Sequence, residues 1–405
     1  NTAYLLERLS QTLERLETLM AIFVSNRYLP RRILLLTGCF ARAAAERHSI
    51  SRLWKQSSGL MARSVTQNAG DHGEHYITRD KKEYWAMFYS AAGGGVLIAL
   101  MALFKTYLGS IIDDKVWKGI AEGLNYGLGF MVIFMLHFTV ATKQPAMTAA
   151  RFAEAVEKTP QGKTVNMKLA QLLVDVFRSQ SIAVLGNVLI AMGLAALIAF
   201  GYQYKTGESL MNADQIAYQL HSIDPLAGTL WFAAIAGVWL FCSGIISGYF
   251  DNRSNYLNMR MRLAQHPLLK KLMSEKTRVK FANYMHENYG SLIGNLCFGM
   301  LLGITGVVGY LTHLPLDIRH VAFSSANVGY IAVSGHFTYS LLLQCIGFVL
   351  LIGLVNLIVS FSLTLWVALR SLNAEIDSWW PIWHEVCQIV KKRPLSLFLP
   401  VQLDK

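Results

Sequence analysis

The segment Tyr339–Leu369 reads YSLLLQCIGFVLLIGLVNLIVSFSLTLWVAL, and it decides the fold. It contains no Asp, Glu, Lys, Arg or His. Because a helix needs about 20 apolar residues to cross the hydrocarbon core of a bilayer, this segment is long enough to cross with tilt. A helix on the surface of a soluble domain would show a polar face. The segment therefore predicts a membrane-spanning helix.

The composition of the whole chain is also typical of a membrane protein. Of its 405 residues, 53% are hydrophobic and only 15% are charged, whereas soluble domains carry about 25% charged residues. The formal net charge is +12. In a soluble protein such a charge would indicate nucleic-acid binding, but in a membrane protein it indicates Lys and Arg held on the cytoplasmic side. The five cysteines lack CxxC spacing, which argues against a zinc site or a disulfide framework.

Five further apolar segments predict additional spans. They are Ala86–Phe104, Gly119–Thr142, Ile182–Tyr204, Leu226–Phe250 and Gly290–Leu311. We therefore predict an all-α fold, a polytopic membrane helix bundle of about six transmembrane helices.

The predicted spans divide the chain into three regions. Residues 81–370 form a six-span transmembrane domain, with basic cytoplasmic loops at 143–181 and 251–289. Residues 1–80 form a cytoplasmic helical region that is soluble or lies against the membrane, and residues 371–405 form a cytoplasmic interfacial tail. Because the first residue is not Met, we expect residues 1–80 to be the end of a longer region.

Along the chain, loops that are rich in Lys and Arg alternate with loops that contain few of them. All but five of the 37 fall on one side of the predicted topology, and the exceptions are Lys105, Lys115, Lys118, Lys205 and Arg319. Cytoplasmic loops are the ones enriched in Lys and Arg, so we predict that both termini are cytoplasmic. Basic cytoplasmic loops of this kind bind anionic lipid, which we expect to be a partner together with the bilayer itself.

The first predicted helix, Asn1–Phe23, is amphipathic. Its leucines recur at steps of three and four residues, with charged residues between them. This periodicity indicates one apolar helix face, which is a surface for a protein partner.

The external segment His313–Thr338 is nearly uncharged and rich in Ser, Ala and Gly. Two interpretations remain open. The segment dips back into the bundle, where irregular backbone is tolerated only beside protein or water, or it forms a short helix on the outer surface.

Polar residues of the second span and of this external segment define a candidate polar cavity. Ionisable residues within spans are often functional. Our hypothesis is that Glu122 meets the external segment in a cavity open to the outside. The candidate residues are Glu122, Asn125, Ser324, Ser325, Asn327 and His336. The alternative places Glu122 among the lipid headgroups and the segment on the surface.

A second group of candidates lies at the cytoplasmic ends of two spans. His137 lies near the end of the second span, and Asp251, Asn252 and Arg253 follow the fourth. These residues act either as structural anchors or as a gate.

Two further sets of residues predict close helix packing. Polar Asn side chains within spans usually form helix–helix hydrogen bonds, and glycines spaced by four residues let backbones approach closely. The first set is Asn187, Asn295 and Asn356, and the second includes Gly119/Gly123/Gly127 and Gly299/Gly303.

Three stretches carry a resemblance to a known family. They are HFTVATKQPA at residues 137–146, GYFDNR at residues 248–253 and DIRHVAFSSAN at residues 317–327. With them the chain resembles a bacterial integral-membrane family called site-specific recombinase, typified by the gonococcal recombinase-like protein. The resemblance spans most of the chain and implies a bacterial inner-membrane location. The family name implies DNA strand exchange.

The residues themselves do not supply the chemistry of that reaction. Tyrosine recombinases typically contain an HxxR element, and none of the eleven histidines has Arg three residues on. Phosphoryl transfer also needs several cations that converge on one phosphate. We therefore expect no specific DNA cleavage, and we predict no catalytic residue, metal or cofactor. The leading interpretation is a transport-like or scaffold bundle, with a recombinase and a membrane enzyme acting on lipid as the alternatives.

Overall fold

The structure is a computed structural model, and it describes most of the chain beyond residue 76. The described residues are 77, 78, 80–140, 163–334, 337–372, 376 and 378–400, with single positions between 9 and 41 and between 148 and 156. The chain divides into two units, Asn1–Gly59 and Leu60–Lys405. In the first unit Leu9, Leu13 and Leu16 are helical, as their spacing predicts, and their side chains are exposed.

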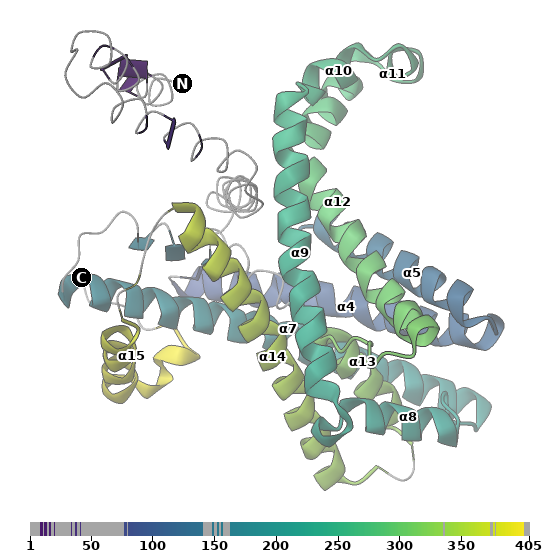
Figure 1. The fold of residues 1–405 in the computed structure, drawn as a ribbon. Coiled ribbons are helices and arrows are strands. Elements are labelled where there is room, and N and C mark those ends of the chain that lie inside the picture. Colours follow the sequence, from purple (N-terminus) through teal and green to yellow (C-terminus); the bar gives the residue numbers. More distant parts are fainter. Residues whose placement is uncertain are drawn as a thin grey trace. The chain divides into compact units, whose positions relative to one another are not determined.

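The second unit is built from helices in every described element (Figure 1). The α-helices are α4 (Lys81–Ile111), α5 (Lys115–Met135), α7 (Lys163–Thr206), α8 (Ala213–Ile223), α9 (Thr229–Tyr256), α10 (Met259–Gln265), α11 (Pro267–Leu272), α12 (Glu275–Thr312), α13 (Val321–Ile331), α14 (Tyr339–Leu372) and α15 (Trp380–Lys392). Two 3-10 helices, η2 (Pro225–Ala227) and η3 (Pro394–Leu397), complete the set. The predicted all-α class is confirmed.

Five of the described helices are long and apolar enough to cross a membrane, namely α4, α7, α9, α12 and α14. They contain five of the six predicted spans. The remaining one, Gly119–Thr142, corresponds to α5, which is not among the five and ends at Met135. Charged and amide side chains near its start, such as Glu122 and Asn125, reduce the hydropathy of α5. His137 then ends the helix, because its φ of 58° lies in the left-handed region.

Helices α5 and α12 run side by side in opposite directions, with their backbones in contact. A methyl group added to Gly299 would collide with the backbone of Gly127, and one added to Gly303 would collide with Gly123. Only glycine permits this approach, so the packing predicted from the four-residue spacing is confirmed.

Helix α13 lies inside the bundle rather than on its surface (Figure 1). Every residue of α13 except Asn327 is buried. The helix packs against α7, α14 and α4, and its Tyr330 hydroxyl donates to the Ala99 carbonyl of α4 at 2.8 Å. Of the two interpretations of segment 313–338, the structure supports the one that returns into the bundle.

Helices α9 and α12 extend together beyond the rest of the bundle as a two-helix arm (Figure 1). We define the arm as residues 251–289. It carries α10 and α11 at its end, and α10 packs mainly on α12.

Candidate functional site

Asn356 of α14 holds the irregular backbone that leads into α13. Its side chain is fully buried in the middle of the most apolar stretch of the sequence. The side-chain oxygen accepts the Val321 N–H at 3.1 Å, and the amide nitrogen donates to the carbonyls of Ala233 at 2.7 Å and Arg319 at 3.0 Å. One side chain therefore joins α14, α9 and the start of α13, which confirms a structural hydrogen bond for this residue.

Arg319 ties the same backbone to the C-terminal end of α8. Its Nε donates to the Ser222 carbonyl at 2.8 Å, and its Nη1 pairs with the Asp317 carboxylate at 2.6 Å. The guanidinium also lies 5.4 Å from the centroid of the Phe232 ring. Arg319 is the one arginine of the predicted external loops, and these contacts with protein groups neutralise its charge.

Aromatic rings fill the space between α5, α12 and α13. His320, at the start of α13, is 1% exposed, and its ring centroid lies 5.9 to 6.3 Å from those of Phe130, Phe298 and Phe323. The rings of Phe323 and Tyr126 approach to 4.3 Å. Burial among these rings lowers the pKa of His320 to about 4, because the charged imidazolium would lose its hydration.

An ion pair joins α4 and α5 toward the predicted external side. Lys105 Nζ lies 3.4 Å from Glu122 Oε2, with side chains 38% and 14% exposed, and 5.6 Å from the centroid of the Tyr126 ring. One turn further, Asn125 donates to the Met101 carbonyl at 2.9 Å. Glu122 is thus neutralised by a lysine that the sequence places on another helix.

The residues of the candidate polar cavity occupy three different settings. The ion pair of Glu122 and the hydrogen bond of Asn125 join α5 to α4. Ser324 and Ser325 are buried in α13, where Ser325 donates to the Ala322 carbonyl at 2.7 Å. Asn327 is half-buried, and His336 lies outside the described residues. An externally open cavity among these residues stays a prediction.

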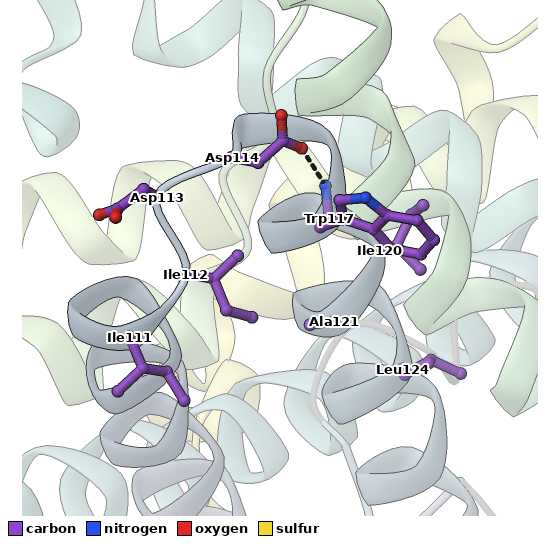
Figure 2. Close-up of a pocket in the computed structure, with 8 residues that line it drawn as sticks. All are labelled: Ile111, Ile112, Asp113, Asp114, Trp117, Ile120, Ala121 and Leu124. Atoms are coloured by element: carbon purple, nitrogen blue, oxygen red, sulfur yellow. Dashed lines mark hydrogen bonds between the residues drawn. The ribbon is translucent and has the colours of Figure 1, made fainter.

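In the described part of the chain, two grooves lie near the predicted external ends of helices, and other residues line them. The first, of about 550 Å³, lies at the turn between α4 and α5, and Figure 2 shows Asp113 and Asp114 beside apolar side chains. Asp114 caps α5 by accepting the Trp117 N–H at 2.9 Å. The second groove, of about 650 Å³, lies between α4 and α7 and includes Tyr107 and Tyr202. Both grooves suit lipid chains better than a polar solute, because most of their lining residues are apolar.

The candidates at the predicted cytoplasmic ends of the helices make contacts within and between helices. The His137 carbonyl accepts the Ser90 hydroxyl at 3.0 Å, and Asp251 Oδ1 accepts the Gly290 N–H at 2.8 Å, which joins α9 to α12. Asn252 is half-buried, and exposed Arg253 reaches the Tyr249 hydroxyl at 3.5 Å. Such contacts are expected of structural anchors, and the choice between an anchor and a gate stays a prediction.

The structure adds polar contacts that the sequence analysis did not identify. Buried Arg178 of α7 donates to the Thr78 carbonyl at 2.6 Å and pairs with Asp175 at 2.9 Å. Buried Ser254 lies 3.1 Å from His286 Nδ1, across the base of the arm. The three-residue spacing of Asp175 and Arg178 on one helix predicts their ion pair, whereas nothing in the sequence links Ser254 to His286.

These features define the class of the protein: an all-helical fold whose described part contains five helices that could span a membrane, which indicates a multi-pass membrane protein, with the short helix α13 buried among them. A family model described as site-specific recombinase matches residues 1–400, so the chain belongs to that family. Searches of curated proteins and of solved structures give no match.

Proposed function

We propose that this protein is a membrane scaffold, a bundle of six crossings with both termini in the cytoplasm that holds the basic arm on the cytoplasmic side. The observation that carries the proposal is the burial of α13. A re-entrant helix that is packed on all sides and held by Asn356 locks the surrounding helices to one another.

The sixth crossing in this proposal is α5. Its glycines 119, 123 and 127 contact α12 from Val307 back to Leu296, so α5 covers the same depth as an apolar helix that can span. With 21 residues, α5 is roughly 31 Å long, close to the thickness of about 30 Å of a bilayer core. Its charged Glu122 is paired with Lys105, which reduces the cost of placing both in the membrane.

The packing favours a scaffold over a transporter. Transporters of known architecture bind substrates near the middle of the membrane, at broken helices whose polar groups face the ligand. Here the buried amide of Asn356 is bonded to protein backbone, and so is that of Asn187, which donates to the carbonyls of Ala91 and Thr139. The aromatic rings around His320 fill the space beside α13.

Cysteine labelling from outside the cell tests the crossing of α5. Asp113 and Glu208 are exposed residues that follow α4 and α7, and each is replaced by Cys in a background without the native cysteines. If α5 crosses, an impermeant maleimide labels both positions in intact cells. If α5 does not cross, Asp113→Cys is labelled and Glu208→Cys is protected, and the six-crossing scaffold is wrong.

The family description favours a second candidate function, DNA strand exchange. Its assay is the trapping of a covalent protein–DNA intermediate by the purified chain. The scaffold proposal expects none, and a trapped tyrosine or serine adduct would replace it with the recombinase.

A further inference from the structure

The arm ends in a surface that is both basic and apolar. We define the tip as residues 256–280, which contain seven Lys and Arg residues and one acid, Glu275. Several of its apolar side chains are largely exposed. They are Tyr256 at 89%, Met261 at 59%, Leu268 at 62% and Leu272 at 77%. Exposed apolar side chains grouped among charges mark an interaction surface.

The tip lies well outside the membrane boundary. The segments of α9 and α12 nearest the bundle lack charged residues up to Phe250 and from Gly290 onward, and the rings of Phe250 and Tyr289 meet at 5.6 Å, as in an interfacial aromatic belt. At about 1.5 Å per residue, the stretch of α12 from Tyr289 back to Glu275 raises the tip by up to roughly 20 Å. The attraction of anionic headgroups is screened within about 8 Å at physiological ionic strength.

From this charge, exposure and height we infer that the tip is a docking site for an acidic amphipathic helix of a cytoplasmic protein. Glutamates or aspartates on such a helix complement the Lys and Arg side chains, and its apolar residues cover Leu268 and Leu272. A nucleic-acid backbone would use the cations only and would leave the leucines exposed to water. A protein helix that is apolar on one face and acidic on the other satisfies both halves of the surface.

The short helices of the tip are held firmly enough to present such a surface. Arg278 of α12 donates through Nε to the Ala264 carbonyl at the end of α10, at 2.7 Å. Pro267 begins α11, and Ser274 caps α12 by accepting the Thr277 N–H at 3.4 Å. The basic and apolar side chains therefore stand on a backbone that is already ordered before a partner binds, which lowers the entropic cost of docking.

The inference rests on the proposed function only in placing the tip on the cytoplasmic side of the membrane, so its test starts with that placement. Gln265→Cys at the tip is labelled in intact cells and in inverted vesicles. Labelling in intact cells would overturn the topology and this inference together. Labelling in inverted vesicles alone leaves the topology standing, and the binding experiment then decides the inference.

The binding experiment uses the full chain in nanodiscs of neutral phosphatidylcholine. The probe is a fluorescent synthetic peptide designed as a helix with Glu on one face and Leu on the other, and its Kd is measured by anisotropy. We expect Lys270→Glu/Lys271→Glu to weaken binding at least tenfold, and Leu268→Ser/Leu272→Ser to weaken it severalfold. The matched control Lys391→Glu/Lys392→Glu reverses an exposed basic pair on α15 and leaves the Kd unchanged.

Competition by other ligands of the same charge completes the test. Equal Kd values for the wild type and both tip variants would overturn the inference. If only Lys270→Glu/Lys271→Glu weakened peptide binding, and duplex DNA displaced the peptide, the tip would be assigned to nucleic acid instead. Displacement by vesicles of phosphatidylglycerol at lower concentration than by unlabelled peptide would assign it to a lipid surface.

Discussion

At the scale of single residues, the buried side chain of Asn356 joins three parts of the fold. Replacing it by Leu removes three hydrogen bonds and leaves the Val321 N–H and the Ala233 and Arg319 carbonyls without that partner. Each buried group left unpaired costs about 1–3 kcal/mol. We therefore expect Asn356→Leu to lower the Tm in detergent strongly.

The control for that variant comes from the same helix. Thr364 is also buried in α14, but its hydroxyl donates to the Ser360 carbonyl of its own helix. Thr364→Ala should change the Tm little. Equal melting of Asn356→Leu and wild type would show that α13 does not depend on this amide.

His320 makes stability depend on pH in a predictable direction. Above a pH of about 6.5 the imidazole is neutral in both the folded and the unfolded chain, so it contributes nothing. Below that pH the unfolded chain binds a proton, while the folded chain does not until the pH approaches its lowered pKa of about 4. Stability is therefore lost as the pH falls through this window, by about 1.4 kcal/mol per pH unit.

The measurement is the change in free energy of unfolding between pH 7 and pH 5. Carboxylates elsewhere also respond to acid, so the wild type is compared with His320→Gln, which cannot titrate. The variant should lose about 2 kcal/mol less on acidification. The same loss in both proteins would show that His320 is protonated in the folded state.

At the scale of elements, the contact between α5 and α12 depends on the absence of side chains. A methyl group at Gly299 would overlap the Gly127 backbone, so Gly299→Ala must push the helices apart and should destabilise the protein by about 1–3 kcal/mol. Gly347→Ala on α14 is the matched control, because nothing lies within 4 Å of its added methyl group.

Of the two glycine variants, only Gly299→Ala should lower the Tm. Ala is favoured over Gly in a helix by about 1 kcal/mol, so Gly347→Ala is neutral or stabilising while Gly299→Ala is destabilising. If both variants melted above the wild type, the α5–α12 contact would be looser than the structure indicates.

The elements also differ in how well the sequence predicts them. Apolar length alone identifies α4, α7, α9, α12 and α14, because the bilayer sets a minimum that few other structures meet. The end of α5 is harder to predict, since residues 138–142 are as apolar as the helix before them, and the left-handed turn at His137 is not visible in hydropathy.

The candidate site is less predictable than the fold for a related physical reason. In a membrane both lipid and protein interior accept apolar residues, so the sequence of α13 does not reveal which of them surrounds it. The partner of Glu122 is equally hidden, because Lys105 lies on another helix and opposite charges in separate segments carry no spacing signal. The glycine spacing did predict a close contact, although it could not say that Gly127 meets Gly299.

At the scale of the whole molecule, the packing around α13 predicts a bundle that does not conduct ions. The ring of Phe323 lies 4.3 Å from that of Tyr126 and 5.8 Å from that of Phe130, and Phe130 lies 5.0 Å from Phe298. Rings at these separations are in direct contact and leave no room for water between them. Proteoliposomes that contain the chain should therefore hold a K⁺ or proton gradient as long as protein-free liposomes do, with valinomycin as the positive control for K⁺.

The variant Phe323→Ala should lose about 3–5 kcal/mol of stability through the cavity it creates. A leak in the wild type that rises with the amount of protein and changes in Phe323→Ala would mean that the aromatic cluster is a gate, and the bundle would then be a transporter rather than a scaffold.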